Sequence, residues 1–287
     1  LPRTYPGTSA AVMGLFSGLH TKVAVYMLYR LYVQLFDLEQ RWNVLIIVIM
    51  IISMMIGAFG GLAENSIRRV LGYQMLNGMP FILVMLAFTS DDPRRALAAG
   101  IMYTIHHMLT VGSLILASGA IEETYGTGLL SKLSGLARRD PIIAWIFAAG
   151  AFSVVGFPPF SGMWGKLMIV FEIARVGGAW AWIAIAAIII ASFAAFLAML
   201  RVWRKVFWGK GLPEDKVPDE LVIRKKLMAP SAALILGSLC MFIFSGIVLD
   251  VVDSAAEQLL DTNAYTETVL GDEPIAVPTI DEIQEGR

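Results

Sequence analysis

The sequence predicts an all-α membrane protein with seven transmembrane helices, the fifth of which is discontinuous. Hydrophobic residues make up 57% of the 287 positions and charged residues only 16%, whereas soluble domains carry about 25% charged residues. The apolar residues are gathered in runs of membrane length, since a spanning helix needs roughly 20 mainly apolar residues. One run holds a double proline, which interrupts a helix because proline has no backbone donor.

The predicted helices follow one another along the chain, and short loops between the first few indicate antiparallel neighbours. Their predicted bounds are Ala10–Phe36, Val44–Leu62, Val70–Phe88, Leu97–Ile121, Ile142–Ile173, Trp180–Phe207 and Leu227–Val252. The two longer links are predicted at residues 122–141 and 208–226.

The fifth predicted helix is broken at Gly156–Gly162, where Pro158 and Pro159 stop it. The half-helix ends created there need a protein interior around them rather than lipid. Lys166 follows in the same apolar run, at a depth where an ionisable group is costly and usually has a partner or carries a proton. The alternative is that Lys166 reaches an interface from a helix end. Because a broken helix with a buried charge recurs in ion-coupled transporters, the first hypothesis is movement of protons or cations.

Few ionisable side chains lie deep in the predicted helices. Of the 22 Lys and Arg residues, only Lys22 and Lys166 do so. Small neighbours of Lys22 allow a close helix contact, and its alternative role is a structural charge capped by a neighbouring carbonyl. All three histidines also lie in predicted helices: His20, His106 and His107.

We predict a proton pathway along Lys22, His106, His107 and Lys166. A histidine titrates near neutral pH and can relay protons through either ring nitrogen. Because His106 and His107 are adjacent, they point about 100° apart on a helix. One of them should therefore face the polar axis, while the other packs or makes a structural hydrogen bond. His20 points to a different face from Lys22 and is interpreted as structural.

Other function classes find no support in the sequence. The histidine pair has no carboxylate or cysteine one turn later, so we predict no metal site. The single cysteine, Cys240, excludes a disulfide within the chain, and the net charge of -1 gives no reason to expect nucleic acid. There is no phosphate-binding glycine loop, haem ligand set or catalytic triad, so we predict no enzyme activity and no cofactor.

The two ends of the chain differ in character. We predict a transmembrane domain at residues 1–252 and an acidic tail at residues 253–287, with a short helical extension to Leu260 before a flexible segment. Of the 22 Lys and Arg residues, 14 fall on one side of the predicted bundle and six on the other, which predicts that the first side is cytoplasmic and the tail external. The chain begins at Leu1 without a Met or a basic segment, so we expect no signal peptide and a preceding part of the protein.

Three stretches together resemble the antiporter-like subunits shared by respiratory complex I, membrane hydrogenases and Mrp (Mnh) multisubunit cation/proton antiporters. The opening through Lys22-Val23-Ala24-Val25-Tyr26 resembles that family's loop and following helix, Ile67–Tyr73 its cytosolic turn, and Gly156–Lys166 its second broken helix with a buried lysine. Thr21-Lys22-Val23 and Arg201–Trp208 are most similar to the D subunit of Mrp antiporters. The resemblance ends near residue 250.

The resemblance implies a subunit of fourteen helices, of which these would be the last seven and would include the second of two inverted repeats. It implies a proton-conducting subunit of a Na⁺/H⁺ antiporter in the plasma membrane, with other subunits of the complex as partners. The alternatives are a proton-pumping subunit of complex I or of a membrane-bound hydrogenase, and a scaffold subunit that transports nothing itself.

The chain departs from this family in two ways. The first broken helix, with its own lysine and glutamate, is missing because the chain starts after it. His107 takes the place of the family's intramembrane histidine, but Val111 stands where members often carry a lysine one turn later. The expected link between Lys22 and Lys166 is therefore a water bridge or His106 and His107 together.

Overall fold

Helices make up all the regular structure in the part of the chain that the computed structural model describes, residues 2–210 and 221–271. Six of these helical stretches are long and apolar enough to cross a membrane. They are Ala10–Gln34, Gln40–Ala63, Ile67–Ala87, Pro93–Tyr125, Gly178–Phe207 and Lys225–Ile243. The predicted all-helical class is thus confirmed for these residues, and the length and composition of the six stretches fit a membrane protein.

The first half of the chain forms four of these stretches. In chain order its elements are η1 (Tyr5–Gly7), α1 (Ala10–Leu15), the π-helical η2 (Phe16–His20), α2 (Thr21–Gln34), η3 (Gln40–Trp42), α3 (Asn43–Ala63), α4 (Ile67–Leu83), the 3-10 helix η4 (Val84–Ala87) and α5 (Pro93–Tyr125). Helix α5 is longer than the predicted Leu97–Ile121. Its start is fixed by Asp92, whose side chain accepts from the backbone N–H of Arg95, and its end by Gly126 in the left-handed region.

The second half contains the interrupted helices. Its elements are α6 (Leu136–Arg139), α7 (Pro141–Val155), α8 (Gly162–Val176), α9 (Gly178–Val202), the π-helical η5 (Trp203–Phe207), α10 (Lys225–Ile243), α11 (Ser245–Leu260) and α12 (Thr262–Leu270). The predicted break at Gly156–Gly162 is confirmed, since α7 ends at Val155 and α8 begins at Gly162. Gly156 has φ +103°, a conformation that favours glycine.

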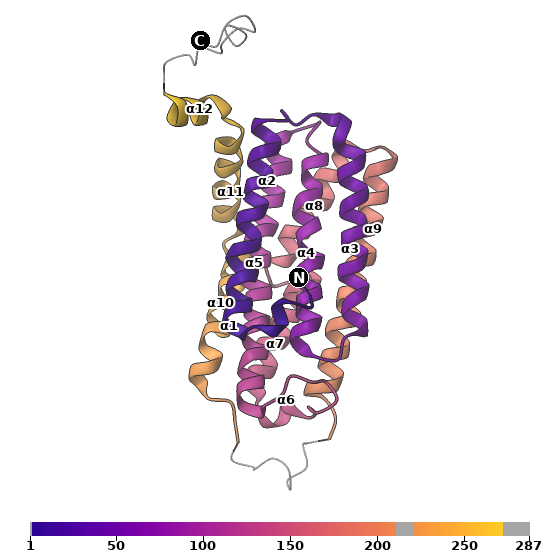
Figure 1. The fold of residues 1–287 in the computed structure, drawn as a ribbon, viewed down its shortest axis with the longest axis vertical. Coiled ribbons are helices and arrows are strands. Elements are labelled where there is room, and N and C mark those ends of the chain that lie inside the picture. Colours follow the sequence, from indigo (N-terminus) through magenta and orange to yellow (C-terminus); the bar gives the residue numbers. More distant parts are fainter. Residues whose placement is uncertain (1, 211–220, 272–287) are drawn as a thin grey trace, which may run out of the picture.

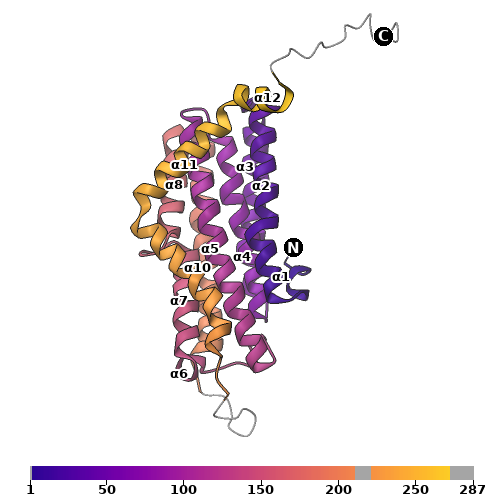
Figure 2. The same ribbon diagram turned by 90° about the vertical axis from the view of Figure 1, so that its left-hand side faces the viewer.

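The last predicted helix, Leu227–Val252, is not continuous, and that prediction is wrong. Phe244 leaves the helical conformation between α10 and α11, and the two helices meet at an angle (Figure 2). The bend lets α11 pack over α2 and α5. Helix α11 reaches Leu260 as expected, but α12 follows where a flexible tail was predicted. The rest of that tail, residues 272–287, lies outside the described residues.

Helix α5 lies at the centre of the bundle and packs against α1, α4, α7, α8, α10 and α11 (Figures 1 and 2). Helix α6 and helix α12 lie at opposite ends of the bundle (Figure 1). The side chains of α5 therefore meet those of several other helices along its length.

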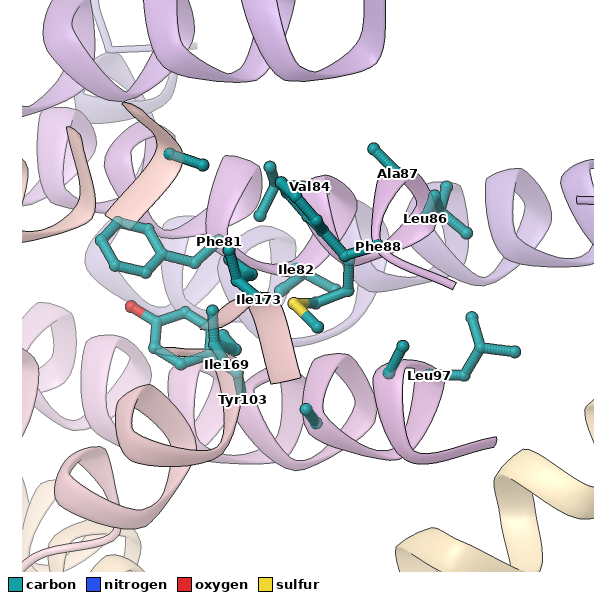
Figure 3. Close-up of a cluster of buried hydrophobic side chains, with 14 of the residues drawn as sticks. Phe81, Ile82, Val84, Leu86, Ala87, Phe88, Leu97, Tyr103, Ile169 and Ile173 are labelled. Atoms are coloured by element: carbon teal, nitrogen blue, oxygen red, sulfur yellow. The ribbon is translucent and has the colours of Figure 1, made fainter. Parts of the chain in front are cut away.

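Two apolar clusters fill the bundle, one toward each end. Along α5, residues 96–103 belong to the first cluster and residues 111–121 to the second. Part of the first, where Phe81, Tyr103, Ile169 and Ile173 meet, is shown in Figure 3. Between the two stretches α5 carries the buried polar side chains of His106, His107 and Thr110. The bundle thus has a layer of buried polar side chains near its middle, here called the polar layer. Other helices also contribute side chains to it.

Candidate functional site

Lys22 lies in the polar layer, 7% exposed. Its Nζ donates to the carbonyl oxygen of Ser17 at 2.9 Å and to Oγ1 of Thr21 at 3.3 Å. Ser17 belongs to the π-helical turn η2, and such turns are frequent at functional sites. The third polar neighbour of Nζ is Nδ1 of His107, at 2.7 Å. An ammonium has three hydrogens to donate, so these three oxygen and nitrogen acceptors match a protonated Lys22. Sδ of Met79, at 3.7 Å, is a fourth and weaker contact.

His107 reaches Lys22 from α5, although 85 residues separate the two in sequence. Its other ring edge lies against the backbone of α4, where a Cβ at Gly78 would lie 2.0 Å from Nε2. The imidazole is therefore confined between α2 and α4. A lysine amine and an imidazole nitrogen at hydrogen-bonding distance can exchange a proton directly, because each group can both bind and release one.

His106 points in a different direction, as expected for adjacent helical residues. Its Nδ1 lies 2.9 Å from Oγ of Ser161, at the start of α8, and 3.3 Å from Oγ1 of Thr110. These hydroxyls connect to Ser153 of α7 and Ser238 of α10. His106 thus faces the helix break, while His107 faces Lys22.

Lys166 lies in the second turn of α8, just beyond the break. Its Nζ donates to the carbonyl oxygen of Val155, the last residue of α7, at 2.8 Å, and to Oγ of Ser192 in α9 at 2.9 Å. Carbonyls at a helix C-terminus have no partner within the helix and carry the negative end of its dipole. The broken helix therefore supplies an acceptor for the amine. Among the described residues, neither Lys22 nor Lys166 has a carboxylate partner.

A stacked aromatic pair contacts both His106 and Lys166. The rings of Phe81 and Tyr103 have centroids 5.2 Å apart at an interplanar angle of 11° (Figure 3). The rings of Tyr103 and His106 form a T-shaped pair with centroids 5.2 Å apart, and Nζ of Lys166 lies 5.2 Å from the centroid of Phe81. The structure therefore brings Lys22 and His107 together directly, but His106 and Lys166 only through intervening groups.

His20 lies apart from this site. Its Nδ1 is 3.2 Å from the hydroxyl of Tyr5 at an exposed position, and its ring contacts Phe16. Val111 is 1% exposed in the second apolar cluster. It supplies no polar group to the layer.

The sequence analysis did not identify two kinds of polar residue in this layer. One is the set of buried hydroxyls around His106. The other is a pair of amides on α4, Gln74 and Asn77, which are 1% and 4% exposed. Within the described residues, both polar atoms of the Gln74 side chain and Oδ1 of Asn77 have no hydrogen-bond partner. Two amides one turn apart in an apolar helix were the available signal, since buried polar groups are normally paired.

The sequence of this chain matches that of a known protein family. Residues 1–195 correspond to the family described as "NADH:quinone oxidoreductase/Mrp antiporter, TM". The chain belongs to this family.

Individual antiporter proteins are also similar to this chain. It is 32% identical over 272 residues to the D subunit of the Na⁺/H⁺ antiporter of Bacillus subtilis (strain 168), covering 94% of this chain and 53% of that protein. It is 29% identical over 273 residues to the protein of the same name from Alkalihalophilus pseudofirmus, with the same coverage of 94% and 53%. The chain thus spans about half the length of the curated relatives it matches.

A solved structure of an Mrp complex, from Dietzia sp. DQ12-45-1b, has the same fold as this chain. The TM-score is 0.87 at 33% sequence identity, covering 94% of this chain and 57% of the matched one. The resemblance to the NADH:quinone oxidoreductase/Mrp antiporter family that the sequence predicted is therefore confirmed, along most of the chain.

Proposed function

We propose that this chain is the C-terminal half of a proton-conducting D-type subunit of a multisubunit Na⁺/H⁺ antiporter. The observation that carries the proposal is the contact of 2.7 Å between Nζ of Lys22 and Nδ1 of His107, in a polar layer between two apolar clusters. Ionisable groups at membrane depth are expensive to keep, and they mark ion or proton paths. The 32% identity to the Bacillus subtilis antiporter protein supports the same assignment.

The proposed path runs across the bundle within the polar layer. A proton on Lys22 passes to His107 over their direct contact. The adjacent His106 faces the helix break, beyond which Lys166 is held by the end of α7. Two positive charges in one layer repel each other, so arrival of a proton at one end favours release at the other. Because Val111 has no ionisable group, we propose that hydroxyls or water complete the step between His106 and Lys166.

In this proposal α7 and α8 together cross the membrane as one interrupted helix, which brings the number of spans to seven. The spans would include the second of two inverted repeats, and the preceding half of the subunit would hold the first. The complex would lie in the plasma membrane, with the end of the bundle near α6 in the cytoplasm. Proton entry would drive Na⁺ out through the complete complex, and the chain would act as a transporter rather than an enzyme.

A second candidate function is a proton-pumping subunit of an NADH:quinone oxidoreductase, because the matched family includes those enzymes. The two functions differ in their driving force. Proton movement that requires Na⁺ supports the antiporter, whereas movement that requires quinone reduction supports the pump. A scaffold subunit would support neither movement through its own residues.

Replacement of Lys166 tests the proposed function. In the complete complex, assayed in inverted membrane vesicles by a fluorescent pH indicator after Na⁺ addition, Lys166→Ala should abolish antiport. Lys166→Arg should restore it only in part, because a guanidinium hardly releases its proton. Lys205→Ala, at an exposed position, is the matched control and should transport at the wild-type rate. Normal antiport by Lys166→Ala, with normal assembly, would reduce Lys166 to a structural role.

A further inference from the structure

Five buried side chains in the polar layer form a closed ring of hydrogen bonds, here called the hydroxyl ring. From Nδ1 of His106 the contacts run to Ser161 (2.9 Å), Ser238 (2.7 Å), Ser153 (3.0 Å) and Thr110 (2.8 Å), and from Thr110 back to His106 (3.3 Å). None of the five residues is more than 1% exposed. The ring joins α5, α7, α10 and the end of the helix break.

The hydroxyl ring is in direct contact with the segment that precedes Lys166. Ser161 is the residue before α8, and its backbone N–H donates to the carbonyl oxygen of Ser238 at 3.2 Å. At the next residue, a Cβ on Gly162 would lie 1.9 Å from the carbonyl oxygen of Ser153 and 2.9 Å from Cε1 of His106. The start of α8 is therefore packed tightly against the imidazole and against α7.

The chemistry of the imidazole gives the ring two arrangements. Nδ1 of His106 either carries a hydrogen and donates, or has a free lone pair and accepts. When it donates to Ser161, the hydroxyl of Ser161 is free to donate to Ser238. When it accepts from Ser161, that hydrogen is used, and Ser238 must donate to Ser161 instead. Whether Nδ1 of His106 carries a hydrogen thus determines which hydroxyl donates in the bond between Ser161, at the helix break, and Ser238 of α10.

We propose that the hydroxyl ring is a positioning network. Through it, the protonation state of His106 determines the hydrogen bonds that attach α10 to the helix break before Lys166. The proposal rests on the proposed function, since it gives His106 a proton to gain and lose. The charged side chains that act on His106 are Lys22, which contacts the adjacent His107, and Lys166. In this proposal the ring links a change of charge at Lys22 to the position of the break before Lys166, although residue 111 is not ionisable.

A neighbouring pair of serines provides a matched control. Ser113 of α5 and Ser231 of α10 are both fully buried. Each hydroxyl donates to the other residue's carbonyl oxygen, at 2.8 and 2.7 Å. This pair joins the same two helices as the hydroxyl ring, but it has no contact with His106 among the described residues.

Three variants of the complete complex test the proposal, with antiport compared at matched amounts of assembled complex. Thr110→Val keeps the shape of the side chain but opens the ring, and it should lower the rate by about fivefold, the worth of a typical buried hydrogen bond. Thr110→Ser keeps the hydroxyl and should transport within about twofold of the wild type. Ser231→Ala removes one of the two hydroxyl-to-carbonyl bonds of the control pair and should leave the rate unchanged.

A double variant distinguishes loss of the ring from two independent packing defects, because independent defects lower the rate separately and their effects multiply. Once the ring is open, a second opening should add little, so Thr110→Val with Ser238→Ala should be no slower than the slower single variant. Rates that multiply, a wild-type rate for Thr110→Val, or an equal loss in Ser231→Ala would each overturn the proposal. If Lys166→Ala also abolishes antiport in that case, the proton path stands and only the coupling is wrong. Full antiport in Lys166→Ala would instead reject the path itself.

Discussion

The imidazole of His107 fills the space that a side chain at Gly78 would need. A Cβ at residue 78 would lie 1.9 Å from Cδ2 and 2.0 Å from Nε2 of His107, far inside van der Waals contact. The opposite edge of the ring lies against Lys22. Gly78 therefore lets the imidazole of His107 lie close against α4, and this position aligns the imidazole with the amine of Lys22.

Gly78→Ala should consequently uncouple His107 from Lys22. The added methyl group forces the imidazole to move, and a displacement of about 1 Å at a proton-transfer pair should slow antiport by roughly tenfold or more. The control is Gly237→Ala, since a Cβ there meets only Leu109 at an ordinary 3.5 Å. Transport by vesicles with equal amounts of complex measures both. Equal rates for the two variants would show that the placement of His107 does not matter.

The two histidines should differ in importance. His107→Ala removes the direct partner of Lys22 and should lower antiport by about 100-fold, the usual size of a lost proton-transfer group. His106→Ala leaves that contact in place, and water in the vacated space can pass the proton on, so it should cost only about fivefold, through the loss of its hydrogen bonds. Rates of proton uptake at matched expression decide between them. Near-wild-type rates for both would show that the histidines carry no proton.

An ion pair in the first turn of α4 should contribute to the stability of the subunit. Arg68 and Glu122 lie 2.6 Å apart, and both side chains are 18% exposed. Arg68 also donates to the carbonyl oxygen of Thr8. Arg68→Ala should destabilise the subunit by about 2 kcal/mol, because it leaves a largely buried carboxylate without its partner.

Thermal unfolding of the purified complex measures that change. The exposed pair of Arg41 and Glu39, with side chains 66% and 42% exposed, supplies the comparison. Arg41→Ala should change stability by less than about 1 kcal/mol, as is usual for surface pairs. A melting temperature lowered equally by both substitutions would contradict the importance assigned to burial.

Cysteine labelling tests the predicted orientation. The basic residues gather at the end of the bundle near α6, which predicts that this end is cytoplasmic. In a Cys240→Ser background, an impermeant maleimide added to intact cells should label Asn263→Cys in α12. It should label Lys210→Cys only after the membrane is opened. The reverse pattern would invert the topology.

The sequence was sufficient to predict the features that depend on local composition. Long apolar runs identified the helices, and the prolines at 158 and 159 identified the break, because a missing donor acts on its own neighbours. The lysines at 22 and 166 were conspicuous for the same reason, since a charge in an apolar run is rare.

The contacts between helices could not be predicted in the same way. Lys22 meets His107 only through the rotation and register of α2 against α5, which no local pattern specifies. Single serines are common in membrane helices, so Ser153 and Ser238 gave no signal until packing joined them. The interruption at Phe244, between α10 and α11, was not predicted because no proline marks it.

The hydroxyl ring also has a consequence for the synthesis of the protein. Its members range from residue 106 to residue 238, and Ser238 makes two of the five side-chain contacts. The ring therefore stays open while the ribosome has yet to deliver α10. Until then Ser153 and Ser161 lack the residue that bridges them, so the coupling proposed for the ring cannot operate in a partly inserted chain.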